Sequence, residues 1–186
     1  MGKLIYITNV SLDGFIEDEH GDFQWTEPDD GYFSFITDLI RPVDTDLYGR
    51  QLYESMAVWE TDPTLAEQSE MNAEFARVWQ DADKVVYSTT LDTVATVRTR
   101  IERRFDPAAV RAMKAEATGD LMIGGADLAA QAFRAGLVDE IHLFVCPVLV
   151  GAGKPGLPSD VRLDLELLDD RRFANGVIYL RHRVRH

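Results

Sequence analysis

Cysteine and long apolar runs are scarce in this sequence, and each of these absences argues against a class of protein. The single cysteine, Cys146, cannot form an intramolecular disulfide, which favours a reduced, intracellular protein. No apolar run approaches the roughly 20 residues that a membrane-spanning helix needs. The first residues show no secretory signal peptide. We therefore expect a cytoplasmic protein that binds no membrane.

Positive charge is also scarce. Lysine and arginine number 19 against 32 aspartates and glutamates, which gives a net charge of -13. This balance argues against nucleic-acid binding, which needs a basic surface. An acidic chain that binds an anion must use a local cluster, so each well-placed arginine is informative. The 186 residues, of which 46% are hydrophobic, are enough for one globular domain with its own core, and we expect a single domain over 1–186.

Strand-like and helix-like segments alternate along most of the chain. Apolar runs predict strands over 4–10, 45–48, 84–88, 93–101, 120–125 and 140–150, and helical spacing predicts helices over 29–39, from about 50, over 65–79, from 107 and up to 135. Residues 151–159 are expected to form a loop. An alternating segment over 161–168 and an Asn175-Gly176 turn predict an antiparallel C-terminal hairpin. The pattern indicates an α/β fold with a mixed, mostly parallel sheet flanked by helices.

Two glycine turns separate a predicted strand from a predicted helix. Gly49 precedes Arg50, and free N–H groups at a helix start together with a guanidinium suit a phosphate, including the 2′-phosphate of NADP. By spacing alone, a turn glycine beside a solvated arginine is the commoner explanation. Gly124 and Gly125 would allow a pyrophosphate to approach the backbone, but they lack the spacing of the dinucleotide fingerprint.

Hydroxyl and carboxyl groups give further candidates. Ser88 and Thr89 follow a strand, where they could donate to a phosphate or cap a turn. Asp30 lies near Trp25 and the aromatic segment 32–35, so a partly desolvated acid could act there, although an ordinary carboxylate at a helix start explains it too. The acidic segment 17–22 matches no calcium or zinc pattern, and we expect no metal.

The order of these motifs resembles that of a known superfamily. The segments SLDGFI (11–16), YGRQLYE (48–54), KVVYSTTL (84–91), IGGADLAAQAFRAGLVDEIHLFVCPVLVGAGKP (123–155) and RRFANGVIYLRHRV (171–184), with a tryptophan at 25, resemble the dihydrofolate reductase-like superfamily. The likeness covers nearly the whole chain. It is greatest to the reductase domain of the bifunctional riboflavin-biosynthesis deaminase-reductase and its stand-alone bacterial relatives.

The resemblance implies a role for each candidate residue. Gly49, Arg50, Ser88 and Thr89 would hold the adenosine phosphate end of NADPH; Gly124, Gly125 and Ala126 would lie beside the pyrophosphate and nicotinamide; Asn9 and Ile16 would contact the nicotinamide; Trp25 would line the substrate pocket and Asp30 would assist protonation. The sequence departs from the family at Leu52, where a threonine is usual, and at Thr89, where a basic residue is frequent. Arg50 is then the main cation, and we expect Arg98 to contribute from the next strand.

The implied activity is an NADPH-dependent reduction of a pyrimidinone- or pterin-like heterocycle. The riboflavin-pathway substrate 5-amino-6-(5-phosphoribosylamino)uracil is favoured because the C-terminal likeness belongs to that branch. Dihydrofolate reduction, which Asp30 favours, is the alternative within enzymes, and a non-catalytic nucleotide-binding module is the alternative outside them. The resemblance also implies a homodimer, formed through segment 140–150 and the C-terminal hairpin.

Overall fold

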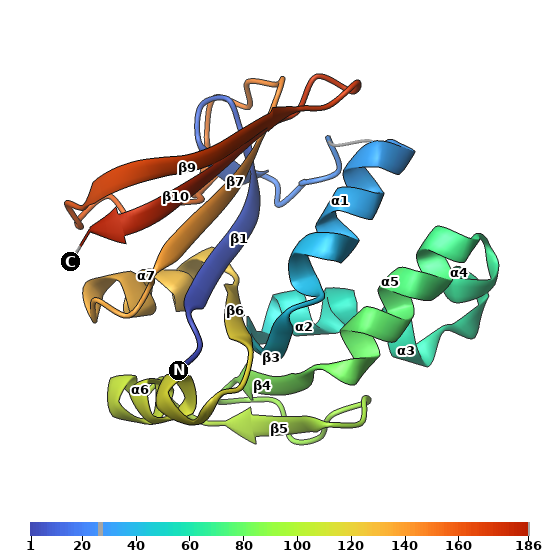
Figure 1. Ribbon diagram of the computed structural model, residues 1–186, viewed down its shortest axis with the longest axis vertical. Helices are drawn as coiled ribbons and strands as arrows, with labels where there is room; N and C mark the ends of the chain where they lie inside the picture. The colour runs from blue at the N-terminus through green and yellow to red at the C-terminus, as the bar shows by residue number, and fades with distance from the viewer. Residues whose placement is uncertain (26–27, 186) are drawn as a thin grey trace.

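A twisted eight-stranded sheet forms the centre of the computed structural model, which describes residues 1–25 and 28–185 (Figure 1). The strand order is β5-β4-β3-β6-β1-β7-β10-β9. The parallel strands are β1 (Leu4–Ser11), β3 (Val43–Gly49), β4 (Asp83–Tyr87), β5 (Thr99–Glu102), β6 (Asp120–Gly124) and β7 (Glu140–Cys146). Strand β10 (Ile178–Arg185) runs antiparallel to both β7 and β9 (Asp164–Arg172). The predicted mixed, mostly parallel sheet with an antiparallel C-terminal hairpin is confirmed.

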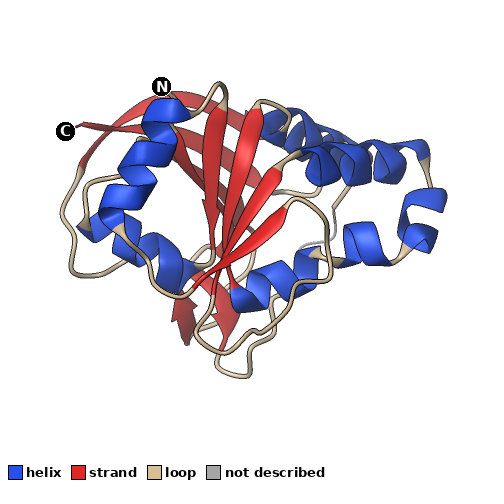
Figure 2. Cartoon of the chain, turned by 90° about the horizontal axis from the view of Figure 1, so that it is seen from below, coloured by secondary structure: helices blue, strands red, loops and turns tan. Residues whose placement is uncertain are grey.

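Helices cover both faces of this sheet (Figure 2). One face carries α6 (Pro107–Glu116) and α7 (Ala126–Arg134). The other carries α1 (Asp30–Ile40), α2 (Arg50–Met56), α3 (Val58–Thr61) and α5 (Glu70–Asp81), and α4 (Pro63–Glu67) packs on α3 and α5. Because side chains alternate along a strand, neighbouring residues enter different cores: Leu47 packs toward α6 and α7, whereas Tyr48 packs toward α5. The three predicted layers are therefore present.

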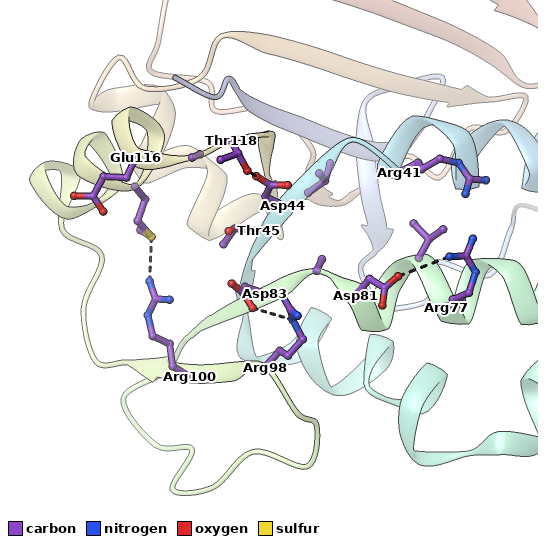
Figure 3. Close-up of a pocket in the computed structure, with 15 residues that line it drawn as sticks. Arg41, Asp44, Thr45, Arg77, Asp81, Asp83, Arg98, Arg100, Glu116 and Thr118 are labelled. Atoms are coloured by element: carbon purple, nitrogen blue, oxygen red, sulfur yellow. Dashed lines mark hydrogen bonds and ion pairs between the residues drawn. The ribbon is translucent and has the colours of Figure 1, made fainter.

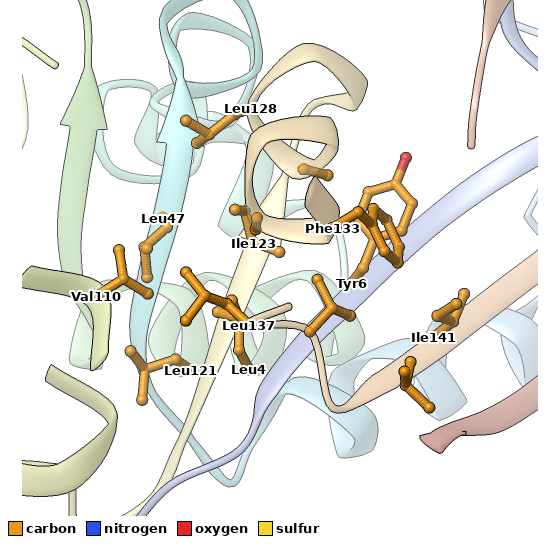
Figure 4. Packing of buried hydrophobic residues seen from close by; sticks show 14 of the residues in the cluster. Leu4, Tyr6, Leu47, Val110, Leu121, Ile123, Leu128, Phe133, Leu137 and Ile141 are labelled. Carbon is orange, nitrogen blue, oxygen red and sulfur yellow. The ribbon is translucent and has the colours of Figure 1, made fainter. Parts of the chain in front are cut away.

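The core under α7 shows why the central strands read as continuous apolar runs. Tyr6 of β1 meets Phe133 of α7 edge-on, with ring centroids 5.5 Å apart (Figure 4). Leu4, Leu121 and Ile123 are fully buried beside them. Strands buried on both faces need apolar side chains at consecutive positions, unlike strands with one solvated face.

Three sequence-based predictions are corrected. The single helix expected over 65–79 is two helices, because Ser69 caps the start of α5 by accepting from the N–H of Asn72 at 3.1 Å. The strand expected over 93–101 starts only at Thr99. The loop expected over 151–159 contains a short strand, β8 (Gly153–Pro155), which pairs with β2 (Phe15–Asp18) in a separate two-stranded sheet.

No helix within residues 1–25 and 28–185 is both long and apolar enough to cross a membrane.

Candidate active site

A cleft of about 1010 Å³ opens at the carboxyl ends of the parallel strands. Open α/β sheets bind ligands at this edge, beside the point where strand order reverses. Here β1 lies between β6 and β7, so the chain crosses the sheet in both directions from that point. The cleft walls come from the ends of β1, β3, β4 and β5, the first turns of α2 and α7, and the small sheet formed by β2 and β8.

The cleft brings together most of the residues that the sequence singled out. They are Asn9, Ile16, Gly49, Arg50, Ser88, Thr89, Gly125 and Ala126, and all of them line it. Gly124 is buried just behind it, and Trp25 and Asp30 are not among the lining residues. Eight residues from five separate segments thus share one cavity.

The start of α2 offers unpaired backbone donors to the cleft. Gly49 is the N-cap, and because it lacks a side chain no side-chain oxygen caps the helix. Its φ of -71° is open to any residue, so the backbone conformation does not require glycine here. A Cβ at this position would meet nothing within 4 Å, which shows that the cleft is open above it.

Arg50 lies beside these donors but is already engaged. Its Nε donates to Glu54 at 2.7 Å and a terminal nitrogen donates to Thr90 at 2.9 Å. Both side chains of the ion pair are about half exposed. Such a pair contributes little to stability, so a ligand phosphate can compete for the guanidinium.

The start of α7 offers a second set of backbone donors. Gly125 is its N-cap with φ +91°, a left-handed conformation that glycine adopts without strain, and no side chain caps the helix. Gly124 is required for close packing, because a Cβ there would collide with the side chain of Leu52. Leu52 therefore fills the space beside the glycine pair and lines the cleft.

Ser88 caps a turn, which was the structural alternative to a phosphate-binding role. Its Oγ accepts from the N–H groups of Thr90 at 3.3 Å and Leu91 at 3.0 Å, so it caps the turn after β4. The side chain still lines the cleft, and the exposed Thr89 is next to it. The turn therefore presents the hydroxyls of Thr89 and Thr90 toward the same end of the cleft as Arg50.

The second cation at this end is not Arg98. Arg98 lies at the opposite edge of the sheet, with Nε 3.0 Å from Asp83, because β5 runs parallel to β4 and only its carboxyl end reaches the cleft. Arg103 and Arg104 follow β5 and line the cleft. Arg103 donates to the carbonyls of Ser88 and Leu91 and holds the turn. Arg104 is exposed and has no ion pair within the described part of the chain. The two arginines directly after a strand were a signal that the sequence analysis missed.

Asp30 does not have the environment expected from the sequence. It is exposed at the first position of α1, while the helix is capped by Asp29, whose carboxylate accepts from the N–H of Tyr32 at 2.7 Å. Trp25 packs against the buried cluster that contains Tyr32 and Phe144, and its indole Nε1 has no hydrogen-bond partner among the described residues. The structure therefore does not bring Asp30 into the cleft, and its part in protonation stays a prediction.

The other end of the cleft is mainly apolar. Ile7, Ile36 and Phe144 form its walls, and Phe23, half exposed, lies at its mouth. Asn9 accepts from the hydroxyl of Tyr32 at 2.8 Å through Oδ1. This contact leaves the amide N–H₂ of Asn9, which is exposed, as a donor at the cleft. Apolar walls with one amide donor suit a flat heterocycle that carries carbonyl oxygens.

A small charged cluster also lines the cleft. Lys154 of β8 has Nζ 2.9 Å from Asp127 of α7 and 3.9 Å from Glu17 of β2. All three side chains line the cleft. Neither this cluster nor any other group of histidine, cysteine, aspartate and glutamate in the described residues could hold a metal ion.

A second cavity, of about 560 Å³, lies at the amino ends of β3 and β4 (Figure 3). Its arginines are paired with carboxylates: Arg41 and Arg77 with Glu74, and Arg98 with Asp83. The four arginines and four carboxylates that line it balance in charge; they are Arg41, Arg77, Arg98, Arg100, Asp44, Asp81, Asp83 and Glu116. We refer to this cavity as the paired groove.

Comparison with known proteins places the sequence among reductase-like relatives. The profile of the RibD C-terminal domain family matches residues 2–179. The uncharacterized protein YyaP of Bacillus subtilis is 30% identical over 182 residues, covering 96% of this chain and 93% of that protein. The uncharacterized protein YwjB of the same organism is 28% identical over 159 residues, covering 82% and 81%.

Solved structures share the fold at low identity. A candidate riboflavin biosynthesis protein from Shewanella sp. PV-4 has a TM-score of 0.77 and 18% identity, with 99% of each chain covered. A diaminohydroxyphosphoribosylaminopyrimidine deaminase/5-amino-6-(5-phosphoribosylamino)uracil reductase from Thermotoga maritima has a TM-score of 0.65 and 15% identity, with 99% of this chain and 57% of that one covered. The family match extends over nearly the whole sequence, and the chain therefore belongs to the RibD C-terminal domain family.

Proposed function

We propose that this chain is an NADPH-dependent reductase that transfers a hydride to a pyrimidinone- or pterin-like substrate, with 5-amino-6-(5-phosphoribosylamino)uracil as the first candidate. One observation carries the proposal: a single cleft joins two uncapped helix starts and a cationic end to an apolar end with an amide donor. The volume of this cleft, about 1010 Å³, and its combination of a cationic end with an apolar end suit a dinucleotide followed by a heterocycle. The reductase-like family supports a nicotinamide cofactor.

The cationic end would select the 2′-phosphate. Arg50 and Arg104 approach it from different strands, with the hydroxyls of Thr89 and Thr90 between them. Guanidinium groups bind phosphate through paired donors, which favours NADPH over NADH. The diphosphate would accept from the backbone N–H groups at the start of α7, beside Gly125, where a side chain would obstruct it.

When bound, the nicotinamide would supply the hydride, and the chain would orient the acceptor carbon against it. Ile7, Ile16 and Phe144 would exclude water from the reacting face, and Asn9 would donate to a ring carbonyl. A proton must also reach the reduced substrate. Asp30 is exposed to solvent outside the cleft, so solvent water is the proton source that the geometry favours.

The test begins with binding. NADPH and NADH are titrated by fluorescence quenching into the wild-type protein, Arg50→Ala and Glu54→Gln. We expect tighter binding of NADPH, about tenfold weaker NADPH binding in Arg50→Ala, and unchanged or tighter binding in Glu54→Gln, which frees the guanidinium. Oxidation of NADPH is then followed by absorbance after 5-amino-6-(5-phosphoribosylamino)uracil is added. The proposal is wrong if neither dinucleotide binds.

Dihydrofolate reduction is the alternative that the same assay resolves. It needs an acid near the substrate, and the exposure of Asp30 counts against it. Turnover of dihydrofolate that is lost in Asp30→Asn would favour it. Dinucleotide binding without oxidation by any pterin or pyrimidine would instead favour a nucleotide-binding module, since a fold does not fix a function.

The homodimer is proposed on the exposed apolar side chains of the C-terminal hairpin. Leu165, Leu167 and Ile178 are 41%, 54% and 45% exposed on β9 and β10. A second copy covering this surface would bury them. Light scattering should give twice the chain mass of 21.0 kDa, and Leu167→Lys should shift the value toward the monomer; a wild-type monomer would contradict the dimer.

A further inference from the structure

Lys154 is the one lysine whose ammonium group faces the cleft within the described residues. Lys3 and Lys114 pair with Glu140 and Asp139 elsewhere, and Lys84 is fully buried. Lys154 lines the cleft together with Gly125, and its Nζ is 2.9 Å from Asp127. Neither the motifs in the sequence nor the proposed cofactor contacts give it a role.

The chain holds the backbone of Lys154 in place through close packing. Lys154 stands opposite Glu17 in the register of the small sheet. A Cβ on Gly153 would collide with the backbone of Glu17, and a Cβ on Gly156 would collide with Val10. The two flanking glycines therefore allow this turn to press against β1 and β2.

A buried hydrogen bond fixes the same turn to the central sheet. The hydroxyl of Tyr6 donates to the carbonyl of Gly156 at 2.6 Å. The backbone N–H of Gly156 also donates to Gly14 at 2.9 Å. Lys154 thus projects from a rigid base, and only its side chain is free to change partner.

The two members of its ion pair differ in exposure. The side chain of Lys154 is 30% exposed, whereas that of Asp127 is 84% exposed. Asp127 can turn into solvent at little loss, because exposed ion pairs contribute little. Lys154 stays within the cleft, and Glu17, with a side chain 21% exposed, remains behind it at 3.9 Å. The arrangement therefore allows the lysine to be transferred to another anion.

We propose that Lys154 binds a phosphate group of the ligand in the cleft and that Asp127 holds it until that ligand arrives. This proposal rests on the proposed function and adds a phosphate-binding residue to it. The phosphate comes either from the diphosphate of the dinucleotide or from a phosphorylated substrate. In both cases Asp127 competes with the phosphate for the same ammonium group, so its carboxylate weakens binding.

The experiment compares four proteins: wild type, Lys154→Met, Asp127→Asn and the double variant. The control Arg134→Met removes a positive charge from α7, the helix that carries Asp127; Arg134 is not among the residues that line the cleft, and it pairs with Asp160 at 2.8 Å. The probes are 2′-phospho-ADP-ribose, which carries the diphosphate without nicotinamide, and 2′-AMP, which lacks the diphosphate. Dissociation constants are measured by calorimetry, and thermal unfolding checks that each variant is folded.

For the diphosphate, we expect Lys154→Met to weaken 2′-phospho-ADP-ribose about tenfold and leave 2′-AMP unchanged. Asp127→Asn should tighten the former about twofold to threefold. The loss caused by Lys154→Met should be larger in the Asp127→Asn background, where no carboxylate competes. Lys154→Arg, which keeps a cation, should retain most of the affinity.

For a substrate phosphate, Lys154→Met should instead leave both nucleotides unchanged and raise the KM for 5-amino-6-(5-phosphoribosylamino)uracil about tenfold. Equal weakening of 2′-AMP and 2′-phospho-ADP-ribose, or an equal effect of Arg134→Met, would show only a general charge effect and overturn the proposal. Unchanged binding and unchanged KM would also overturn it. If the wild-type protein binds no nucleotide, the proposed function fails first.

Discussion

The two edges of the sheet formed by the amino ends and by the carboxyl ends of the parallel strands differ in whether the chain supplies partners for their charged side chains. At the amino ends of β1 and β7, Glu140 is 2% exposed and accepts from Arg181 at 2.8 Å and His142 at 3.2 Å, with Lys3 at 3.0 Å. At the carboxyl ends, Arg104 faces the cleft without an ion pair in the described residues. Charges that find their partners within the chain stabilise the fold, whereas charges without partners remain available to a ligand.

The paired groove shows that a cavity alone does not make a site. It contains more arginines than the cationic end of the cleft, yet they meet carboxylates from the same helix or the neighbouring strand. Within 1–25 and 28–185 no helix starts at this groove: α5 and α6 line it with their last turns, which present carbonyl groups and no free N–H groups. The cavities therefore differ in their unsatisfied groups and in their balance of charge: four carboxylates match the four arginines of the groove, whereas Glu17 and Asp127 are the carboxylates beside four cations in the cleft.

The largest expected effect comes from removing the charge of Glu140 at the amino ends of β1 and β7. Glu140→Gln removes the charge that Arg181 and Lys3 share, and it leaves two cations without a buried counter-charge. Arg181 and Lys3 are 34% and 48% exposed and can be solvated, so the loss is that of charge-assisted hydrogen bonds to a buried carboxylate, about 2 kcal/mol of the free energy of unfolding. Chemical denaturation measures the loss, and NADPH affinity should stay the same. A variant as stable as the wild type would remove the distinction between the two edges.

The same cluster predicts how stability depends on pH. Burial alone would raise the pKa of Glu140, but hydrogen bonds from Arg181, Lys3 and His142 outweigh it and hold the pKa at about 2. Between pH 4.5, the ordinary pKa of a glutamate, and pH 2, this carboxyl binds a proton in the unfolded chain but stays ionised in the folded one. The contribution of Glu140 to stability is therefore present above pH 4.5 and is lost toward pH 2. Burial also lowers the pKa of His142, so acid destabilises the fold through both groups. Glu140→Gln should flatten the curve between pH 4.5 and 2.

The next largest effect comes from adding a side chain to the cleft at the start of α7. Gly125→Val places a β-branched residue at φ +91° and a side chain against the uncapped start of α7. We expect at least about tenfold weaker NADPH binding and a loss of about 1–2 kcal/mol in stability.

Gly136→Val is the matched control for that variant. Gly136 also has a positive φ, +61°, and an added Cβ there meets nothing within 4 Å, but it ends α7 away from the cleft. The two variants should therefore lose similar stability, and only Gly125→Val should lose affinity. Equal loss of affinity in both would attribute the effect to the fold and not to the cleft.

A smaller effect is expected from Arg104→Met. Its guanidinium is partly solvated, so its removal should weaken NADPH about fivefold. NADH, which lacks the 2′-phosphate, should bind unchanged. Parallel titrations of the two dinucleotides measure the difference, and an equal loss for both would show that Arg104 does not select the 2′-phosphate.

The smallest effect is expected in the paired groove. Arg98 has φ +54°, and Arg98→Gly removes this strain together with an exposed ion pair to Asp83. These changes oppose each other, so stability should alter by less than about 1 kcal/mol. NADPH affinity should not change. A change in affinity would mean that the groove and the cleft are coupled.

Local patterns in the sequence predicted the parts of the fold that depend on neighbouring residues. Each of these features was predicted from its own short segment: the buried strands, the turn at Asn175-Gly176, and the strand-to-helix breaks at Gly49 and Gly125. The break at Ser69 was missed because apolar spacing continues across it, and only the serine cap stops the helix.

Long-range pairing could not be predicted in the same way. Glu17 and Lys154 are opposite each other in the small sheet, although more than 130 residues separate them in the chain. The position of Arg98 was wrong for a similar reason: its distance from the cleft depends on where β5 starts, and a strand shifted by a few residues exchanges Arg98 for Arg104. The glycine turns that line the cleft were thus accessible from motifs; of the charged residues that line it, Arg50 was predicted, and Arg103, Arg104 and Lys154 were not.

The place of β1 in the sheet has a consequence for synthesis of the protein. Among the described residues, β1 (Leu4–Ser11) pairs with β6 and β7, which are made later and begin at Asp120 and Glu140. While the ribosome adds the intervening residues, this apolar strand has neither of its edges paired. Exposed strand edges in nascent chains are prone to aggregate and to bind chaperones. Ribosome-bound chains should therefore resist proteolysis in β1 only after β7 has emerged from the exit tunnel.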